Sequence, residues 1–550
     1  MKSSIYTFLL TLCSVSLWAD NILITDADLV GGQTYNWTAD NTYTLDGFVF
    51  LEAGGILNIE PGTQIIGQAE PTGNDLASSL IITRGAKIFA IGNASNPIVF
   101  KSEFFINFND RKQWGGLVVL GNGILGDTAP EKRIEGFPDG EDRALYGGND
   151  DTDNSGIIRY VSIRHGGAEI AEGDEINGLT LGGVGSGTMI DHVEVIGNSD
   201  DGIEFFGGAV SVKYAVVSFC GDDAIDYDTG WRGNVQFAFV LQGDDQADSA
   251  GEHDGAKPDD NARFANPNFY NCTYIGSGLN AAPDIKNAYA LLFRDGAGGT
   301  YANSIFTSFA NFALEVEDLA EGLDARQRME NGELNLKNNI WWEFGEGDQF
   351  NTGTNGILVA TEGAPDASAQ FLIDHLAAND NVIADPQLVS ISRTADNGLH
   401  PYPSPDGPAY ENLADYPADP FFTPVGYKGA FGLDGNTLDL SWTALEEYNI
   451  LSSTVGVAEV TAENGMTLSQ SVPNPTAGSA LIEFSLPAGT DVIVTVFDLS
   501  GKVVSVLADN ARFSAGTHTV ELDASELNAG IYFYTLTTKD VSLTKSLIVK

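Results

Sequence analysis

Acidic residues recur at a fixed spacing near the middle of the chain. The sequence Asp-Gly-Ile-Glu, which contains Asp201 and Glu204, returns 22 residues later as Asp-Ala-Ile-Asp, which contains Asp223 and Asp226. If one coil of a repeating β structure has this length, each acidic residue lies beside its counterpart, about 4.8 Å away in a parallel sheet. Because side chains alternate between the faces of a strand, Glu204 and Asp226 should point outward while Ile203 points inward. Stacked carboxylates repel one another unless they are protonated, solvated or bridged by a cation.

Three interpretations of these carboxylates stay open at the level of sequence. Oxygen ligands at this density suit calcium, in a structural or an adhesive site. A calcium ion held there could also take part in catalysis. Alternatively, Asp-Asp-Gly and Asp-Asp-Ala are turn formers, chosen because they tolerate tight backbone geometry. The predicted metal ligands are Asp201, Glu204, Asp223, Asp226 and Asp228.

A similar period appears outside the acidic residues. The strand candidates 213–217 and 236–240 start 23 residues apart, and residues 191–195 lie 22 before the first of them. Residues 62–65 and 85–88 also repeat at 23. A fixed period of this size is typical of a solenoid, in which each unit buries its apolar face on its neighbours. Short strands without intervening helices predict an all-β fold, a right-handed parallel β-helix.

The predicted β-helix covers residues 20–450 and carries several additions. Insertions are expected at 121–153, 243–268 and 343–380, and an irregular closing segment at 400–424. Loops on a rigid solenoid are where binding usually resides. The second insertion is rich in acid, and its mixed oxygen and imidazole ligands could hold a transition metal. Its ligands have no fixed spacing, however, so a solvated loop is the stronger expectation.

The β-helix prediction is accompanied by a family resemblance. The early glycine turns and Trp114-Gly115-Gly116 resemble many bacterial right-handed β-helix proteins. Further motifs resemble a surface-protein family of the Bacteroidota; they are residues 200–208, 221–231, 421–422, 427–431 and Trp442. The resemblance implies an architecture and a surface location, and it implies no activity.

A catalytic function is the alternative prediction. The stacked carboxylates of residues 201–204 and 223–226 are called the acidic ladder below. This ladder is similar to that of β-helix polysaccharide lyases, in which calcium neutralises a uronate carboxylate and a basic residue removes the adjacent proton. The candidates for the base are Arg159, Arg164, Arg232 and Lys213, with His165 or His192 assisting. The sequence has no His-Glu-x-x-His, nucleophile elbow, Walker loop or Cys-x-x-Cys pair, so no catalytic set identifies itself.

Aromatic residues form a second candidate binding surface. Trp114, Tyr227 and Trp231 could stack on sugar rings if they are exposed in a groove, and Arg232 completes this predicted ligand-binding set. At least one of Trp341 and Trp342 must be a core or end-cap residue, because they lie on alternate faces of one strand.

The charge balance limits the partners of the protein. The chain has 27 Lys and Arg against 76 Asp and Glu, a net charge of −49. Such a chain repels nucleic acid and anionic membranes. From Met466 onward there are 5 basic and 8 acidic residues, so the excess of acid lies before that point and indicates a domain boundary nearby.

The N-terminal residues predict export. Lys2 precedes a short apolar run at 5–12, and Ala19 is a small residue at a plausible cleavage point. This is the layout of a secretory signal peptide over residues 1–19. No other apolar stretch has the length of a membrane span, so a soluble mature protein is expected. Cys220 and Cys272 remain after cleavage, and the sequence does not decide whether they pair.

The C-terminal residues predict a second domain after a linker at 451–466. Residues 467–550 alternate short strands with Gly, Asn and Asp turns, which predicts a small β-sandwich. The order of motifs resembles the type A C-terminal sorting domain of the type IX secretion system. The resemblance implies that the secretion machinery reads this domain and delivers the chain through the periplasm to the cell surface or the medium. The motif residues are Pro473, Asn474, Pro475, Gly501, Lys502, Gly530, Tyr532, Lys545 and Lys550.

The leading functional hypothesis is a secreted or surface protein that binds extracellular carbohydrate or another surface ligand, with calcium as the candidate cofactor. A calcium-dependent polysaccharide lyase is the alternative. The third hypothesis is a structural protein, an anionic coat or filament subunit whose surface charge is itself the function.

Overall fold

The fold is described from a computed structural model. It describes residues 20–73, 75–105, 107–171, 174–282, 285, 289–432, 437–452, 460–461, 466–468, 471, 476, 478–498, 502–525, 527–528, 530–539 and 542–549. The predicted signal peptide and most of the predicted linker lie outside these residues. The chain divides into two compact units, Met1–Leu451 and Ser452–Lys550, which are treated separately below.

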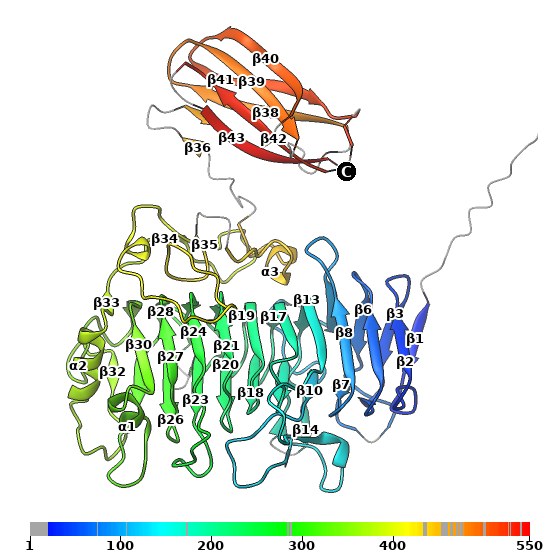
Figure 1. The fold of residues 1–550 in the computed structure, drawn as a ribbon, viewed down its shortest axis with the longest axis vertical. Helices are drawn as coiled ribbons and strands as arrows, with labels where there is room; N and C mark the ends of the chain where they lie inside the picture. Colours follow the sequence, from blue (N-terminus) through cyan, green and yellow to red (C-terminus); the bar gives the residue numbers. More distant parts are fainter. Residues whose placement is uncertain are drawn as a thin grey trace, which may run out of the picture. The chain divides into compact units, whose positions relative to one another are not determined.

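The first unit is a stack of coils with parallel strands (Figure 1). One strand of each coil joins a 10-stranded sheet. Its strands are β4 (Phe48–Leu51), β7 (Ser79–Ile82), β10 (Leu117–Leu120), β16 (Leu179–Gly182), β18 (Ile203–Phe206), β20 (Ile225–Asp228), β23 (Gly251–Asp254), β26 (Leu291–Arg294), β29 (Leu314–Val316) and β32 (Leu358–Val359).

The rest of each coil joins a 19-stranded sheet. Its strands are β1 (Asn21–Ile24), β2 (Thr34–Trp37), β3 (Thr42–Leu45), β5 (Ile56–Ile59), β6 (Gln64–Gly67), β8 (Lys87–Ile91), β9 (Ile98–Ser102), β13 (Gly156–Arg164), β17 (Met189–Ile196), β19 (Ser211–Ser218), β21 (Asn234–Gln236), β22 (Phe239–Leu241), β24 (Asn268–Tyr270), β25 (Thr273–Ile275), β27 (Gly299–Ala302), β28 (Ile305–Phe309), β30 (Leu334–Lys337), β31 (Ile340–Phe344) and β33 (Val382–Ile383).

A bend divides this second part of each coil. Seven successive coils place one left-handed residue at the bend, with φ between 48° and 61°. These residues are Tyr160, His192, Tyr214, Phe237, Asn271, Asn303 and Asn338. Asparagine tolerates this conformation well, whereas an aromatic residue there is unusual. The four aromatic rings stack on one another from coil to coil, with centroids 4.2, 4.5 and 5.1 Å apart.

The inward side chains of the two sheets form one continuous core. It contains Leu181, Ile203, Phe205, Ile225 and Phe293 from the 10-stranded sheet, together with alternate residues of the other sheet. The parallel β-helix prediction is therefore confirmed. The prediction that one of the two adjacent tryptophans is core is also confirmed, since Trp341 is fully buried.

The predicted register holds in the middle of the β-helix and fails near its start. Glu204 pairs with Asp226, and Lys213 pairs with Asp191 and Gln236, as the period predicts. Residues 62–65 and 85–88, however, do not stack, because β6 pairs with β3 and β9, whereas β8 pairs with β5 and β13. The two segments look alike because each has a glycine turn before a strand, with Gly62 and Gly85 both at positive φ.

Two additions cover the outside of the coils. The 121–153 insertion contains the short strands β11 (Lys132–Arg133) and β12 (Leu145–Tyr146) and packs on the outer face of the 10-stranded sheet. The closing segment is longer than predicted, residues 388–451, and starts with β34 (Leu388–Ser390) and β35 (His400–Pro403). It packs on the outer face of β17, β19, β22 and β25.

The closing segment also crosses the stack of coils (Figure 1). Seven successive coils each contribute a hydrogen bond or ion pair to residues 412–447 of this segment. The contributing residues are Arg164, Glu194, Lys213, Gln236, Asn271, Asn303 and Asn338.

The remaining elements of the first unit are short. They are the hairpin β14 (Glu169–Ala171) and β15 (Asp174–Glu175), the helices α1 (Ala325–Glu330), α2 (Gln370–Ala378) and α3 (Ala444–Glu447), and single 3₁₀ turns at Asp142–Ala144 and Pro408–Tyr410. In the described part of the chain no helix is long and apolar enough to cross a membrane. Cys220 and Cys272, left open by the sequence, are separate buried thiols.

The second unit consists of two antiparallel sheets. One contains β36 (Val460–Thr461), β37 (Thr467–Leu468), β38 (Ser479–Leu486) and β41 (Gly516–Asp523), and the other contains β39 (Thr490–Asp498), β40 (Val503–Phe513), β42 (Gly530–Thr537) and β43 (Ser542–Val549). Their facing apolar residues, such as Phe484 and Tyr534, form one core. This is the predicted small sandwich.

Candidate functional site

The acidic ladder lies on the outer face of the 10-stranded sheet. Thr180, Glu204, Asp226 and Glu252 occupy equivalent positions of β16, β18, β20 and β23. The predicted outward direction is confirmed, because Ile203 and Phe205 on either side of Glu204 lie in the core. The ladder is nevertheless covered, since Glu204 is only 6% exposed.

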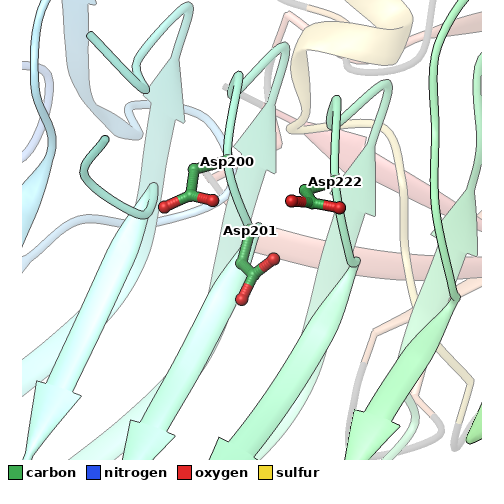
Figure 2. Close-up of side chains that lie close together, drawn as sticks. All are labelled: Asp200, Asp201 and Asp222. Atoms are coloured by element: carbon green, nitrogen blue, oxygen red, sulfur yellow. The ribbon is translucent and has the colours of Figure 1, made fainter. Parts of the chain in front are cut away.

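The carboxylates form three overlapping groups in which the oxygens lie within 4.8 Å of one another. The groups are Asp200, Asp201 and Asp222; Asp201, Glu204 and Asp226; and Asp223, Asp226 and Glu252. Figure 2 shows the first group at the turns that lead into β18 and β20. Asp200 and Asp222 of this group line a cavity of about 420 Å³.

Two of the aspartates also hold the turns together. The backbone N–H of Asp223 donates to Asp201 Oδ1 at 3.0 Å, and the N–H of Ser249 donates to Asp223 Oδ1 at 2.6 Å. Each of the two carboxylates thus accepts a hydrogen bond from a backbone N–H of the next coil. The turn-forming interpretation of Asp201 and Asp223 is supported to this extent, and it leaves their second oxygens for another role.

In the described part of the chain, Glu204 and Asp226 have no such backbone partner. Glu204 accepts a hydrogen bond from the side-chain amide of Asn177. Asp226 Oδ1 is buried and has no hydrogen-bond partner among the described residues. An unpaired buried carboxylate oxygen is costly unless it is protonated or meets a cation.

Burial raises the pKa of every carboxyl group in the ladder. The pKa values of Asp201, Glu204, Asp223 and Asp226 lie well above their usual range, first because of burial and then because of repulsion between neighbouring carboxylates. The same causes raise the pKa of Asp200 to about 7. Burial also raises the pKa of Glu252 to about 7, although Arg294 opposes the rise. Without a cation, some of these groups are neutral at neutral pH.

The predicted ligand set needs two corrections. Asp228 joins none of the three groups, because it lies two residues along β20 from Asp226, at the other end of the strand. Glu252, by contrast, belongs to the ladder, although the sequence placed it in a solvated insertion. The acidic insertion contains a regular strand of the sheet, β23, and His253 on that strand is fully buried against Tyr227.

The fold and the sequence agree with known families. Residues 31–368 match the family described as pectate-lyase like β-helix domain. The chain belongs to this family. Residues 472–550 of this pectate-lyase-like β-helix protein match the secretion system C-terminal sorting domain. The protein is therefore a type IX secretion cargo exported to the cell surface or the extracellular space.

Other comparisons add little. No curated protein matches this pectate-lyase-like β-helix protein. Among solved structures, the enzymatically active domain of bacteriophage CBA120 tailspike protein 2 aligns with 9% identity and a TM-score of 0.23, over 95% of this chain and 73% of that one. A likeness this weak carries no argument about function.

The sorting motif lies partly within the described residues. Gly530 begins β42, and Tyr532 on the same strand is buried, with its hydroxyl donating to the Asn528 carbonyl. Lys545 on β43 is buried and is the register partner of Tyr534 on the neighbouring strand β42. Lys502 precedes β40. The remaining motif residues, Pro473, Asn474, Pro475, Gly501 and Lys550, lie outside the described residues.

The three aromatic residues predicted to bind sugar are core residues. Trp114, Tyr227 and Trp231 are fully buried inside the β-helix. Each polar atom is paired: Trp114 Nε1 donates to the Arg164 carbonyl, Trp231 Nε1 to the Val210 carbonyl and the Tyr227 hydroxyl to the Gly298 carbonyl. The condition for stacking on a ligand, exposure in a groove, is not met.

The predicted basic residues do not lie beside the ladder. Arg164 and His165 are buried beneath the closing segment, where they contact Glu447 and Tyr448. Arg159, His192, Lys213 and Arg232 line a groove on the 19-stranded sheet instead. Among the described residues, Arg294 reaches the ladder and pairs with Glu252 and with Asp254. Lys112, which pairs with Glu175, lines the cavity beside Asp200 and Asp222.

Proposed function

We propose that this exported β-helix protein acts at the cell surface or beyond it as a carbohydrate-binding protein whose scaffold holds calcium on the acidic ladder. The sorting domain and the β-helix support the location. The observation that carries the calcium proposal is the group formed by Asp201, Glu204 and Asp226, in which the buried Asp226 Oδ1 has no hydrogen-bond partner among the described residues.

The donor set favours calcium over other metals. The three groups offer carboxylate oxygens, and no imidazole or thiolate joins them within the part of the chain that is described. Calcium takes six to eight oxygen ligands with flexible geometry, whereas transition metals prefer nitrogen or sulfur. Asp226 belongs to two of the groups, so a cation beside it would relieve repulsion in both.

Thermal unfolding of the full chain, followed by circular dichroism with calcium and with a chelator, tests this site. At a calcium concentration 100 times the Kd, binding stabilises the folded state by about 2.7 kcal/mol. For a unit of this length that corresponds to a rise in Tm of roughly 3 °C. The double variant Glu204→Gln/Asp226→Asn should lose this rise. In chelator it should also melt above the wild type, because it removes the repulsion without removing the hydrogen-bonding groups.

The control is Glu346→Gln/Asp348→Asn, which makes the same change of charge at two exposed positions of the β-helix unit. It should keep the calcium response. Equal Tm values for the wild type in calcium and in chelator would reject the ladder as a calcium site. A response that survives in the ladder variant would place the cation elsewhere.

The lyase alternative gains no support from the ladder. A lyase would need a base beside the calcium ligands in a groove that admits a polymer. Here Asp201, Glu204 and Asp223 are each less than 8% exposed, and the nearby Arg294 is paired with two carboxylates. The geometry therefore favours a cation that stabilises the scaffold over one that contacts a substrate.

A further inference from the structure

The sorting domain has an exposed apolar face. It is the outer face of the sheet formed by β40, β39, β42 and β43 (Figure 1). Side chains alternate along these strands: Val494 and Val496 of β39 and Tyr534 of β42 lie in the core, so the residues between them point outward. Phe533 is 37% exposed and Val506 is 52% exposed. The outer face of an antiparallel sheet usually carries polar residues, because it meets water.

The outward residues line up in rows across the strands. Two rows that cross β40, β39 and β42 in register are Val503, Phe497 and Phe533, and Val506, Thr495 and Thr535. These side chains are all uncharged. Beyond the rows, at the start of β39, Asp491 forms an ion pair with Arg512 at 3.4 Å, and Lys502 precedes β40. An apolar centre with a polar rim is the layout of a protein–protein interface.

The outer face of the opposite sheet has a different composition. On β38, Leu481 is 50% exposed, and the next outward residue, Glu483, is an exposed acid. The register partner of Leu481 on β41 is also acidic, Glu521. A single apolar residue among acidic ones is normal for the surface of a soluble protein. Within the described residues, the apolar face therefore belongs to one side of the sandwich.

The described residues of the sorting motif belong to the sheet that carries this face. Gly530 and Tyr532 lie on β42, Lys545 lies on β43, and Lys502 precedes β40. Tyr532 and Lys545 are buried, so a receptor cannot contact most of either side chain in the folded domain. Their burial stabilises the sheet, and the surface of this sheet that a receptor can contact is its outer face.

We propose that this apolar face is the surface through which the type IX secretion machinery recognises the protein, by means of an uncharged, apolar surface of its own. The proposal is independent of the calcium site and of carbohydrate binding, because it concerns the sorting domain alone. The charge of the domain supports an apolar contact. From Met466 onward, 8 acidic residues are nearly balanced by 5 basic ones, so attraction between net charges contributes little to its recognition.

Two other occupants fit the face less well. The β-helix unit carries most of the net charge of −49, and carboxylates on its surface would lose their water if they covered an apolar face. A second copy of the domain would cover Phe533 and Val506 before export. A sorting signal, by contrast, has to stay accessible until the machinery has bound it.

Export of the full chain from a bacterium that has a type IX secretion system tests the proposal. Val506→Glu places a charge on the face, and Phe533→Ser removes its exposed ring. Each variant should lower the ratio of exported to periplasmic chain about tenfold or more, because changes at the centre of an interface remove a large share of the binding energy. Phe533→Leu, which keeps the face apolar, should be exported nearly as well as the wild type. Immunoblots of fractionated cells, with an antibody against the β-helix unit, measure the ratio.

Leu481→Glu is the matched control. It makes the same change from an aliphatic to an acidic residue as Val506→Glu, at a strand position of nearly equal exposure, 50% against 52%, on the opposite sheet. It should be exported like the wild type. Thermal unfolding of the purified full chains shows that each variant is folded. Export of Val506→Glu and Phe533→Ser at the level of the wild type would overturn the proposal, and so would an equal loss of export in Leu481→Glu.

Sedimentation of the purified full chain separates the possible occupants of the face. If the wild type is a dimer and Val506→Glu is a monomer that is exported normally, the face joins two copies and the proposal is wrong. The proposal is equally wrong if Val506→Glu is exported normally but melts at a lower temperature, since the face then packs within the molecule. A folded, monomeric Val506→Glu that accumulates in the periplasm, beside a wild type that is also monomeric, would support it.

Discussion

Replacing Trp231 with alanine is expected to lower the free energy of unfolding of the β-helix unit by about 3–5 kcal/mol. The indole is fully buried, and its ring stacks on Phe205 with centroids 3.9 Å apart. Its removal leaves a cavity and deprives the Val210 carbonyl of a hydrogen bond. Urea unfolding followed by circular dichroism measures the loss without depending on the fluorescence of the deleted residue.

The comparison variant is Trp342→Ala, because Trp342 is partly exposed and should cost less. If Trp231→Ala instead kept the stability of the wild type, the assignment of the indole to the core would be wrong.

The second large effect concerns pH. The pKa of Glu252 is raised by burial from its ordinary value of 4.5 to about 7, so the folded state binds more protons than the unfolded chain between these pH values. Stability from this group is therefore fully present below about pH 4.5 and is lost as the pH rises through 7. At 1.36 kcal/mol per pKa unit, the loss is about 3 kcal/mol. The pKa values of the other ladder carboxyl groups, those of Glu204 and Asp226, are raised in the same direction.

Urea unfolding in chelator at pH 4.5 and pH 8, for the wild type and Glu252→Gln, measures this term. Groups with lowered pKa values, such as Asp191 and Asp245, have the opposite pH dependence but are common to both proteins and cancel in the difference. The wild type should lose more stability than the variant as pH rises, and calcium should reduce that loss because metal ligands must be deprotonated. Parallel pH profiles in chelator would contradict the raised pKa.

The period of the sequence predicts strand register only where coils have uniform length. From Asp191 to Gln236 three successive coils differ by 22 or 23 residues, and their register is confirmed. The next coil is longer: Glu252 pairs with Asp226, which is 26 residues earlier. The local pattern of strand β23, acid-aromatic-acid in Glu252-His253-Asp254, matches Asp226-Tyr227-Asp228 and could have revealed the fourth ladder position.

Burial of the candidate site could not be predicted in the same way. Strand alternation correctly predicts that Glu204 points outward. The insertion that packs on this sheet, residues 121–153, is remote in sequence from Glu204. Its docking depends on tertiary contacts, such as that of Tyr146 with Phe206. The aromatic prediction failed for a related reason. Trp231 and Tyr227 sit beside turns, and sequence alone does not distinguish a ring that closes a core from one that lines a groove.

The closing segment has a consequence for how the protein unfolds. In a solenoid each coil contacts its nearest neighbours only, so the ends can fray and cooperativity is lost over long arrays. Here one segment is bonded to seven successive coils, from Arg164 to Asn338. Opening any one of them also strains the bonds of the other six. Those coils should therefore unfold as one block in a single sharp transition, a behaviour closer to that of a globular domain than to that of a repeat protein.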